Sequence, residues 1–204
     1  KDIPEKWSES PRSIKSLNPD WKYVLTTDDD NRIFVTKNFP EYLNMFDSFE
    51  HPIQRVDVFR YMWLYINGGV YIDLDEVLKI PLDEILDKNS EIYLRNGCNY
   101  LIVGSGIEIN FLASVPKHKF WLDVLEEIQR RYLNKERPKI RTKVFDVFFS
   151  TGGLVVSKMA NNYKNSIVYI DKDSTKSLLG RSWYNINHYY LITVLVIIII
   201  IAIL

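Results

Sequence analysis

Two acidic side chains near the middle of the chain have the types and spacing of a metal site. Asp73 and Asp75 follow the apolar, β-prone residues 70–72 and are separated by Leu74. Because alternate side chains of a strand share a face, we expect both carboxylates on one side and Leu74 turned towards the core. Mg²⁺ or Mn²⁺ suits such oxygen ligands and usually completes its shell with waters and substrate phosphates. The pattern predicts a metal–diphosphate site at the carboxyl end of a strand, where ligands bind in open α/β sheets.

The residues upstream must position these acids. Pro52 suits the first position of a helix, while Asn67 and Gly68 supply a helix stop and Gly69 permits a tight reversal. Between them, apolar residues recur at helical spacing and are expected to face the core: Ile53, Val56, Phe59, Met62, Trp63 and Ile66. This order predicts a helix that turns directly into the strand carrying the two acids.

A second face of the same helix carries polar groups. Asp57, Arg60 and Tyr61 stand at i, i+3 and i+4, so they share a face that differs from the apolar stripe. An acid, a guanidinium and a phenol grouped just before a carboxylate pair can bind sugar hydroxyls and phosphate.

The whole stretch reads D-x-x-R-Y-x-x-L-Y-x-x-G-G-x-Y-x-D-x-D. It resembles the DxD sugar-binding region of glycosyltransferase family 32, which includes initiation-specific α-1,6-mannosyltransferases and inositol-phosphoceramide mannosyltransferases. It is also similar to the catalytic core of the large clostridial glucosylating toxins. The resemblance runs from residue 3 to about residue 183.

The resemblance implies an α/β domain over residues 1–188 with a GT-A-type nucleotide-sugar-binding fold, in which helices flank a mostly parallel central sheet. Asp73 and Asp75 would be the catalytic pair and would hold Mn²⁺ (or Mg²⁺) on the donor diphosphate. The metal would act as a Lewis acid for the departing nucleotide.

The resemblance also implies a donor-binding set: Asp57, Arg60, Tyr61, Gly68, Gly69, Tyr71, Asn110, Ser182 and Trp183. In it the glycines would admit substrate to the backbone, and Tyr71 would lie near the nucleotide. Ser182 and Trp183 stand in a G-x-S-W-like element that closes on the diphosphate in related enzymes. The residues alone leave alternatives open: Asn110 as a turn or edge residue, and Trp183 as a membrane-interface aromatic.

The implied reaction is retaining transfer of a hexose to a glycan or glycolipid acceptor. GDP-mannose is the favoured donor, and a UDP-sugar is the alternative. Three departures bear on this expectation. Gly153 replaces the proline of a Thr-Gly-Pro segment near the acceptor, and His188 is on the wrong side of the closing element to complete a metal shell. The opening KDIPEKW resembles the piece that follows the family's first strand, which lines the nucleotide pocket.

Two other classes remain as alternatives. A haloacid-dehalogenase-type phosphatase also has an apolar strand ending in D-x-D-x-V, with Asp73 as nucleophile and Asp75 as acid/base. That hypothesis leaves Asp57, Arg60 and the glycine pair unexplained. The other alternative is a non-catalytic, membrane-tethered binding module, suggested by the apparent lack of the family's first strand and of a suitably placed histidine.

Length and composition limit the number of domains and the kinds of binding partner. The 204 residues fit one domain. Lys plus Arg and Asp plus Glu both number 26, so no basic excess indicates nucleic acid. Residues 189–204 are nearly all apolar and, as a helix of about 24 Å, predict a membrane anchor; a buried strand or helix is the alternative. We therefore expect membrane association, at the Golgi or another endomembrane in a eukaryote.

Other local signals predict further elements. Strands are expected at residues 21–26, 91–94, 100–103 and 167–170, and an amphipathic helix at 117–132. Helix caps or first-turn acids are expected at the following residues: Asp28, Asp29, Asp30, His51, His118, and Ser150 or Thr151.

Overall fold

A computed structural model describes residues 3–86, 90–100, 104–138 and 142–178. The helices are α1 (Glu9–Leu17), α2 (Asp28–Asn38), α3 (Leu43–Ser48), α4 (Pro52–Asn67), α5 (Leu82–Ile85), α6 (Lys119–Leu133), α7 (Lys143–Ser150) and α8 (Gly153–Ala160). The strands are β1 (Gly69–Ile72), β2 (Glu76–Leu78), β3 (Ile92–Tyr100), β4 (Gly104–Ser114), β5 (Ile167–Ile170) and β6 (Thr175–Ser177).

The strands form two sheets. The larger has the order β1-β4-β3-β5, and β2 pairs with β6 in the smaller. This arrangement confirms the α/β class. In the described part of the chain, however, only β3 and β5 pair in parallel, whereas β4 is antiparallel to both β1 and β3. The expectation of a mostly parallel sheet is corrected to a mixed one. One reason is that β3 and β4 follow each other in the chain, and a short connection favours antiparallel pairing.

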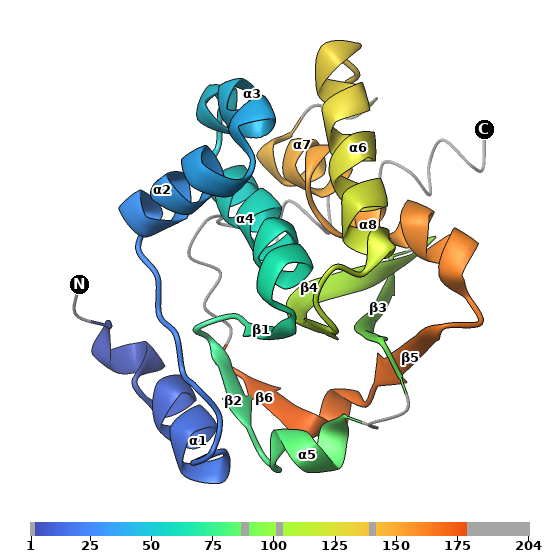
Figure 1. The fold of residues 1–204 in the computed structure, drawn as a ribbon. Coiled ribbons are helices and arrows are strands. Elements are labelled where there is room, and N and C mark those ends of the chain that lie inside the picture. The colour runs from blue at the N-terminus through green and yellow to red at the C-terminus, as the bar shows by residue number, and fades with distance from the viewer. Residues whose placement is uncertain (1–2, 87–89, 101–103, 139–141, 179–204) are drawn as a thin grey trace.

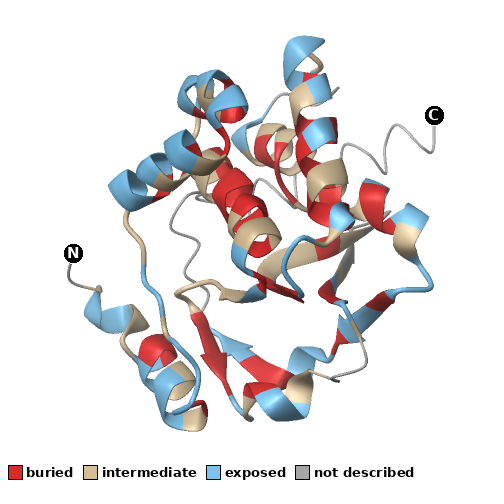
Figure 2. Ribbon diagram, in the orientation of Figure 1, coloured by how far each residue is buried: buried red, intermediate tan, exposed pale blue. Residues whose placement is uncertain are grey.

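Helix α4 crosses the middle of the molecule and packs against α2, α3, α6 and α7 as well as β1 and β4 (Figure 1). Its predicted bounds are confirmed, with His51 as the N-cap residue. The predicted apolar stripe is only partly right, because four of its six residues are half-buried: Ile53, Val56, Trp63 and Ile66. Neighbours on several sides bury half of the residues of the helix, including the polar Asp57. Figure 2 shows this buried stretch of α4 in red.

A glycine pair reverses the chain between α4 and β1. Gly68 and Gly69 have φ values of 64° and 85°, a region that side chains disfavour. A Cβ on Gly68 would lie 2.6 Å from the backbone nitrogen of Pro116, whereas a Cβ on Gly69 would meet nothing within 4 Å. The close approach at Gly68 is therefore to the protein's own chain.

Several local predictions are confirmed. Thr27 caps α2 in a capping box with Asp30, so the acids there lie in the first turn as expected. His118 caps α6, where its Nδ1 accepts a hydrogen bond from the backbone N–H of Phe120. Strand β5 has the predicted bounds.

Other local predictions are wrong. Residues 21–26 form no strand, because no described strand pairs with them. Helix α8 begins after Gly152, and Ser150 instead ends α7.

The predicted anchor at residues 189–204 lies outside the described residues. In the part of the chain that the structure describes, no helix has the length and apolar character needed to cross a membrane.

Candidate active site

The two acids of the D-x-D motif lie in a tight turn. Strand β1 ends at Ile72, and the backbone N–H of Glu76 donates to the carbonyl of Asp73 across 3.0 Å. The strand alternation expected for Asp73 and Asp75 therefore does not apply. Leu74 is half-buried and lines a cleft instead of pointing into the core.

Arg60 joins the helix to this turn. Its Nη2 lies 3.0 Å from Asp57 Oδ1, its Nη1 lies 3.3 Å from Asp73 Oδ1, and Nη1 also donates to the carbonyl of Ile109 at 2.5 Å. The side chains of Asp57 and Arg60 are 2% exposed, whereas that of Asp73 is 30% exposed. The predicted acid and guanidinium thus lie beneath the first acid of the motif, which alone of the three reaches solvent.

Tyr71 completes the contacts of Asp73. Its hydroxyl donates to Asp73 Oδ1 at 2.8 Å, and the Arg60 guanidinium lies 4.4 Å from the ring centroid. Burial raises the pKa of the Tyr71 phenol well above its usual value, with Arg60 opposing the shift. The hydroxyl therefore stays protonated and acts as a donor at neutral pH.

Asp57 is held by two elements. Thr151, between α7 and α8, donates its hydroxyl to Asp57 Oδ2 at 2.9 Å. Burial raises the pKa of Asp57 to about 6, although Arg60 and Thr151 oppose the shift. Burial alone would lower the pKa of Arg60, but neighbouring Tyr71 and the carboxylates of Asp73 and Asp57 outweigh it and raise that pKa. At neutral pH the cluster holds one cation between two carboxylates.

Tyr61 lies behind this cluster. Its hydroxyl donates to the carbonyl of Thr151 at 2.8 Å, and its ring stacks on Trp121 with 5.6 Å between centroids. The structure therefore holds Tyr61 between Thr151 and the α6 residue Trp121.

A second polar network starts at Asn110. Its backbone carbonyl accepts the N–H of Asp73 at 2.8 Å, and its Nδ2 donates to Glu76 Oε1 at 3.0 Å. Arg95 Nη1 and the Thr175 hydroxyl bind the other oxygen of Glu76 at 3.0 and 2.6 Å. The Oδ1 atom of Asn110 is buried and has no partner among the described residues. Sequence reasoning missed Glu76, Arg95 and Thr175.

The donor atoms near the turn fit a metal that a substrate helps to bind. Across the described ranges, no cluster of three or more His, Cys, Asp or Glu side chains could hold an ion by itself. Two carboxylates, from Asp73 and Asp75, are nevertheless enough for Mg²⁺ or Mn²⁺ when substrate phosphates and waters fill the remaining positions. Ser182, Trp183 and His188 lie outside the described residues.

A cleft of about 680 Å³ runs beside the turn. Residues 21–26, α4 and β1 line it, with Trp21, Trp63, Gly69 and Tyr71 among the lining residues. Its size falls in the range of small-molecule sites.

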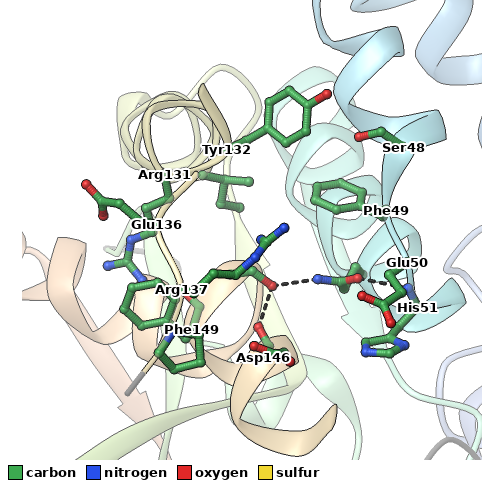
Figure 3. Close-up of a pocket in the computed structure, with 14 residues that line it drawn as sticks. Ser48, Phe49, Glu50, His51, Arg131, Tyr132, Glu136, Arg137, Asp146 and Phe149 are labelled. Carbon is green, nitrogen blue, oxygen red and sulfur yellow. Dashed lines mark hydrogen bonds between the residues drawn. The ribbon is translucent and has the colours of Figure 1, made fainter. Parts of the chain in front are cut away.

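A separate hollow of about 170 Å³ lies between α6, α7 and the start of α4 (Figure 3). Both signs of charge line it, including Arg131, Arg137, Glu136 and Asp146. Gln54 also lines the hollow, and its Nε2 donates to Ser150 Oγ at 2.7 Å.

Comparisons with known proteins agree with the motif and the fold. Residues 4–91 match the family model of the glycosyltransferase sugar-binding region containing a DXD motif. Fold and motif together define the class, a GT-A-type glycosyltransferase fold, and residues 4–91 are similar to this family of sugar-binding regions.

Two curated relatives are similar to this chain over most of its length. The chain is 33% identical over 193 residues to the mannosyl phosphorylinositol ceramide synthase CSH1 of Saccharomyces cerevisiae, covering 91% of this chain and 48% of that protein. It is 35% identical over 156 residues to inositol phosphoceramide mannosyltransferase 3 of Schizosaccharomyces pombe, covering 76% and 40%. The chain thus spans about half the length, or less, of these relatives.

A solved structure supports the fold. The PaToxG glycosyltransferase superposes with a TM-score of 0.54 at 15% identity, over 80% of this chain and 65% of that one.

Proposed function

We propose that this chain is the catalytic part of a metal-dependent, retaining mannosyltransferase that uses GDP-mannose and a glycolipid acceptor. The family match supports a nucleotide-sugar donor. The acceptor class follows the names of the relatives, which are inositol phosphoceramide mannosyltransferases. A UDP-sugar donor is the second candidate.

The observation that carries the proposal is the fixed carboxylate of Asp73. Arg60 and Tyr71 both bind its Oδ1. Its other oxygen, together with the carboxylate of Asp75, would face the metal and the donor diphosphate. When bound, the metal would neutralise charge on the departing nucleotide diphosphate.

The residues behind Asp73 would act by orientation. Asp57 is occupied by Arg60 and Thr151 and is buried, so it is poorly placed to attack the sugar. We therefore infer attack by the acceptor hydroxyl on the face of the leaving group. The bond from the acceptor oxygen to the anomeric carbon forms, the bond from that carbon to the diphosphate oxygen breaks, and the hydroxyl proton passes to the departing phosphate. Trapping a covalent glycosyl-enzyme would contradict this mechanism.

Thermal unfolding tests which nucleotide sugar the chain binds. The unfolding midpoint is measured with GDP-mannose, UDP-glucose, UDP-galactose and UDP-N-acetylglucosamine, each with and without Mn²⁺. A ligand at 100 times its dissociation constant adds about 2.7 kcal/mol of stability. We expect the midpoint to rise with GDP-mannose only when Mn²⁺ is present, and the rise to vanish in Asp73→Ala and Asp75→Ala.

Transfer to an inositol phosphoceramide acceptor tests the reaction. Labelled mannose should move from GDP-mannose to the lipid. A phosphoenzyme at Asp73 would instead indicate the phosphatase, and donor binding without transfer or hydrolysis would indicate a binding module.

We also propose that residues 189–204 attach the chain to a membrane of the secretory pathway. Flotation with phospholipid vesicles should capture the full chain and lose it when those residues are removed. Equal flotation of both forms would contradict the assignment.

A further inference from the structure

Glu76 follows the D-x-D turn directly and is almost completely buried, with 1% of its surface exposed. The proposed reaction gives it no role. A buried carboxylate is costly unless it is paired and hydrogen-bonded, and both of its oxygens are occupied. Its contacts run to the same turn that presents Asp73 and Asp75.

Three residues close a ring of hydrogen bonds around this turn. The N–H of Asp73 donates to the carbonyl of Asn110, and the N–H of Glu76 donates to the carbonyl of Asp73. The Nδ2 of Asn110 donates to Glu76 Oε1 and completes the ring. Because a carboxylate cannot donate, this contact also fixes which way the Asn110 amide points.

The ring is anchored to both sheets. Arg95 from β3 and Thr175 from β6 bind the remaining oxygen of Glu76, and Arg95 Nη2 donates to the Thr175 hydroxyl at 2.7 Å. Arg95 is itself buried and lies over the ring of Phe111 from β4. The turn therefore has a rigid support that reaches it through one side chain.

We propose that Glu76 is a positioning residue that fixes the D-x-D turn, and thereby the carboxylates of Asp73 and Asp75, for a divalent cation and a nucleoside diphosphate. The inference rests on the proposed function. Partners of metal ligands typically change metal affinity 10- to 100-fold when they are removed. The loss should therefore appear in binding of Mn²⁺ with GDP, without any sugar or turnover.

Two matched double variants isolate the contact. Glu76→Gln with Arg95→Met removes both buried charges together and keeps an oxygen that can accept from Asn110. Glu76→Met with Arg95→Met also removes both charges but provides no acceptor. Exchanging a whole buried ion pair for neutral residues of similar volume is often tolerated, so both proteins should fold.

The measurement is Mn²⁺ binding to the full chain by electron paramagnetic resonance in the presence of GDP, with UDP as a second arm. We expect the Mn²⁺ affinity of the Glu76→Gln, Arg95→Met variant to lie within about threefold of the wild type. The affinity of the Glu76→Met, Arg95→Met variant should be at least about tenfold lower. Asn110→Ala removes the same hydrogen bond from its other side while leaving Glu76 its partners Arg95 and Thr175, and should show the same loss.

A control separates positioning from general loss of stability. Glu127 is another buried carboxylate, paired with Arg130, Arg131 and Lys158, and it lies on α6. Glu127→Gln should lower the unfolding midpoint without changing Mn²⁺ affinity. Equal affinity of the two double variants, or unchanged affinity in Asn110→Ala, would overturn the positioning role. Failure of the wild type to bind Mn²⁺ with either diphosphate would instead contradict the proposed function.

Discussion

At the scale of single residues, the site depends on Arg60. One buried guanidinium contacts carboxylates from a helix and a turn and also a backbone carbonyl of β4. Arginine provides this geometry because its donors form a planar fork, whereas lysine offers a single point charge.

Arg60→Lys should therefore lower the rate of the proposed mannose transfer at least about tenfold, since one ammonium cannot hold Asp57 and Asp73 together. Steady-state kinetics with GDP-mannose measure the effect. Arg32→Lys is the matched control, because Arg32 pairs with Asp47 at the surface and such pairs contribute little. Equal loss in both variants would show that the guanidinium bridge is not responsible.

Asp57 should make stability depend on pH. Its pKa is raised to about 6 in the folded chain, so between pH 4 and pH 6 the folded state holds a proton that the unfolded state has released. Stability therefore falls as pH rises through this window, by at most about 3 kcal/mol from this group. Below pH 4 both states are protonated, and above pH 6 both are ionised, so the slope ends there.

Urea unfolding of the wild type and Asp57→Asn at pH 4, 5, 6 and 7 checks this sign. Relative to the variant, the wild type should lose stability from pH 4 to pH 6 and then level off. Parallel curves for the two proteins would contradict the burial-raised pKa.

The sequence predicted part of this residue-level arrangement. The fixed offsets between Asp57, Arg60 and the D-x-D acids placed them on adjoining local elements, and the structure brings Arg60 to both Asp57 and Asp73. The partners of the acids could not be predicted. Thr151 and Asp57 are 94 residues apart, and Thr175 and Glu76 are 99 apart. Only the folded chain makes them neighbours.

At the scale of elements, the turn from α4 into β1 sets where the site lies. Gly68→Ala should destabilise the chain by more than about 1 kcal/mol, since it combines a positive φ with a Cβ that collides with Pro116. Gly69→Ala has comparable strain but open space, so its loss should be smaller. Chemical denaturation compares the two variants, and an equal loss in both would remove the collision as a cause.

Elements with strong local signals were predicted well. Pro52 and Gly68 bound α4 because start and stop signals act locally. Residues 21–26 have the composition of a strand but find no described partner, and β1 ends before Asp73 because a turn begins there. Pairing and turn closure depend on the rest of the fold, so composition could not reveal them.

At the scale of the whole molecule, the sequence motif predicted the α/β fold class, but it did not predict the direction of strand pairing. The site draws on α4, on the larger sheet through Asn110 and Arg95, and on the smaller sheet through Thr175. The motif itself is a short stretch of sequence, but the contacts that hold its side chains in place come from elements throughout the described domain.

The cleft beside β1 has a consequence for how the protein behaves in concentrated solution. Among the described strands β1 pairs only with β4, so one of its edges is open. Its residues line the cleft together with Val24 and Leu25, each 45% exposed. Unpaired strand edges beside apolar side chains recruit further strands, and a net charge of zero provides no repulsion between molecules. The chain should therefore self-associate through this edge as its concentration rises.

Val24→Lys should raise the concentration at which light scattering begins to increase, because a charged side chain in the cleft beside the open edge of β1 opposes strand addition. Leu133→Lys adds the same charge at an exposed apolar residue at the end of α6, 68% exposed, and should have little effect. Equal protection by both variants would assign the association to net charge. If Val24→Lys alone reduces self-association, the association surface of this protein lies at one open strand edge.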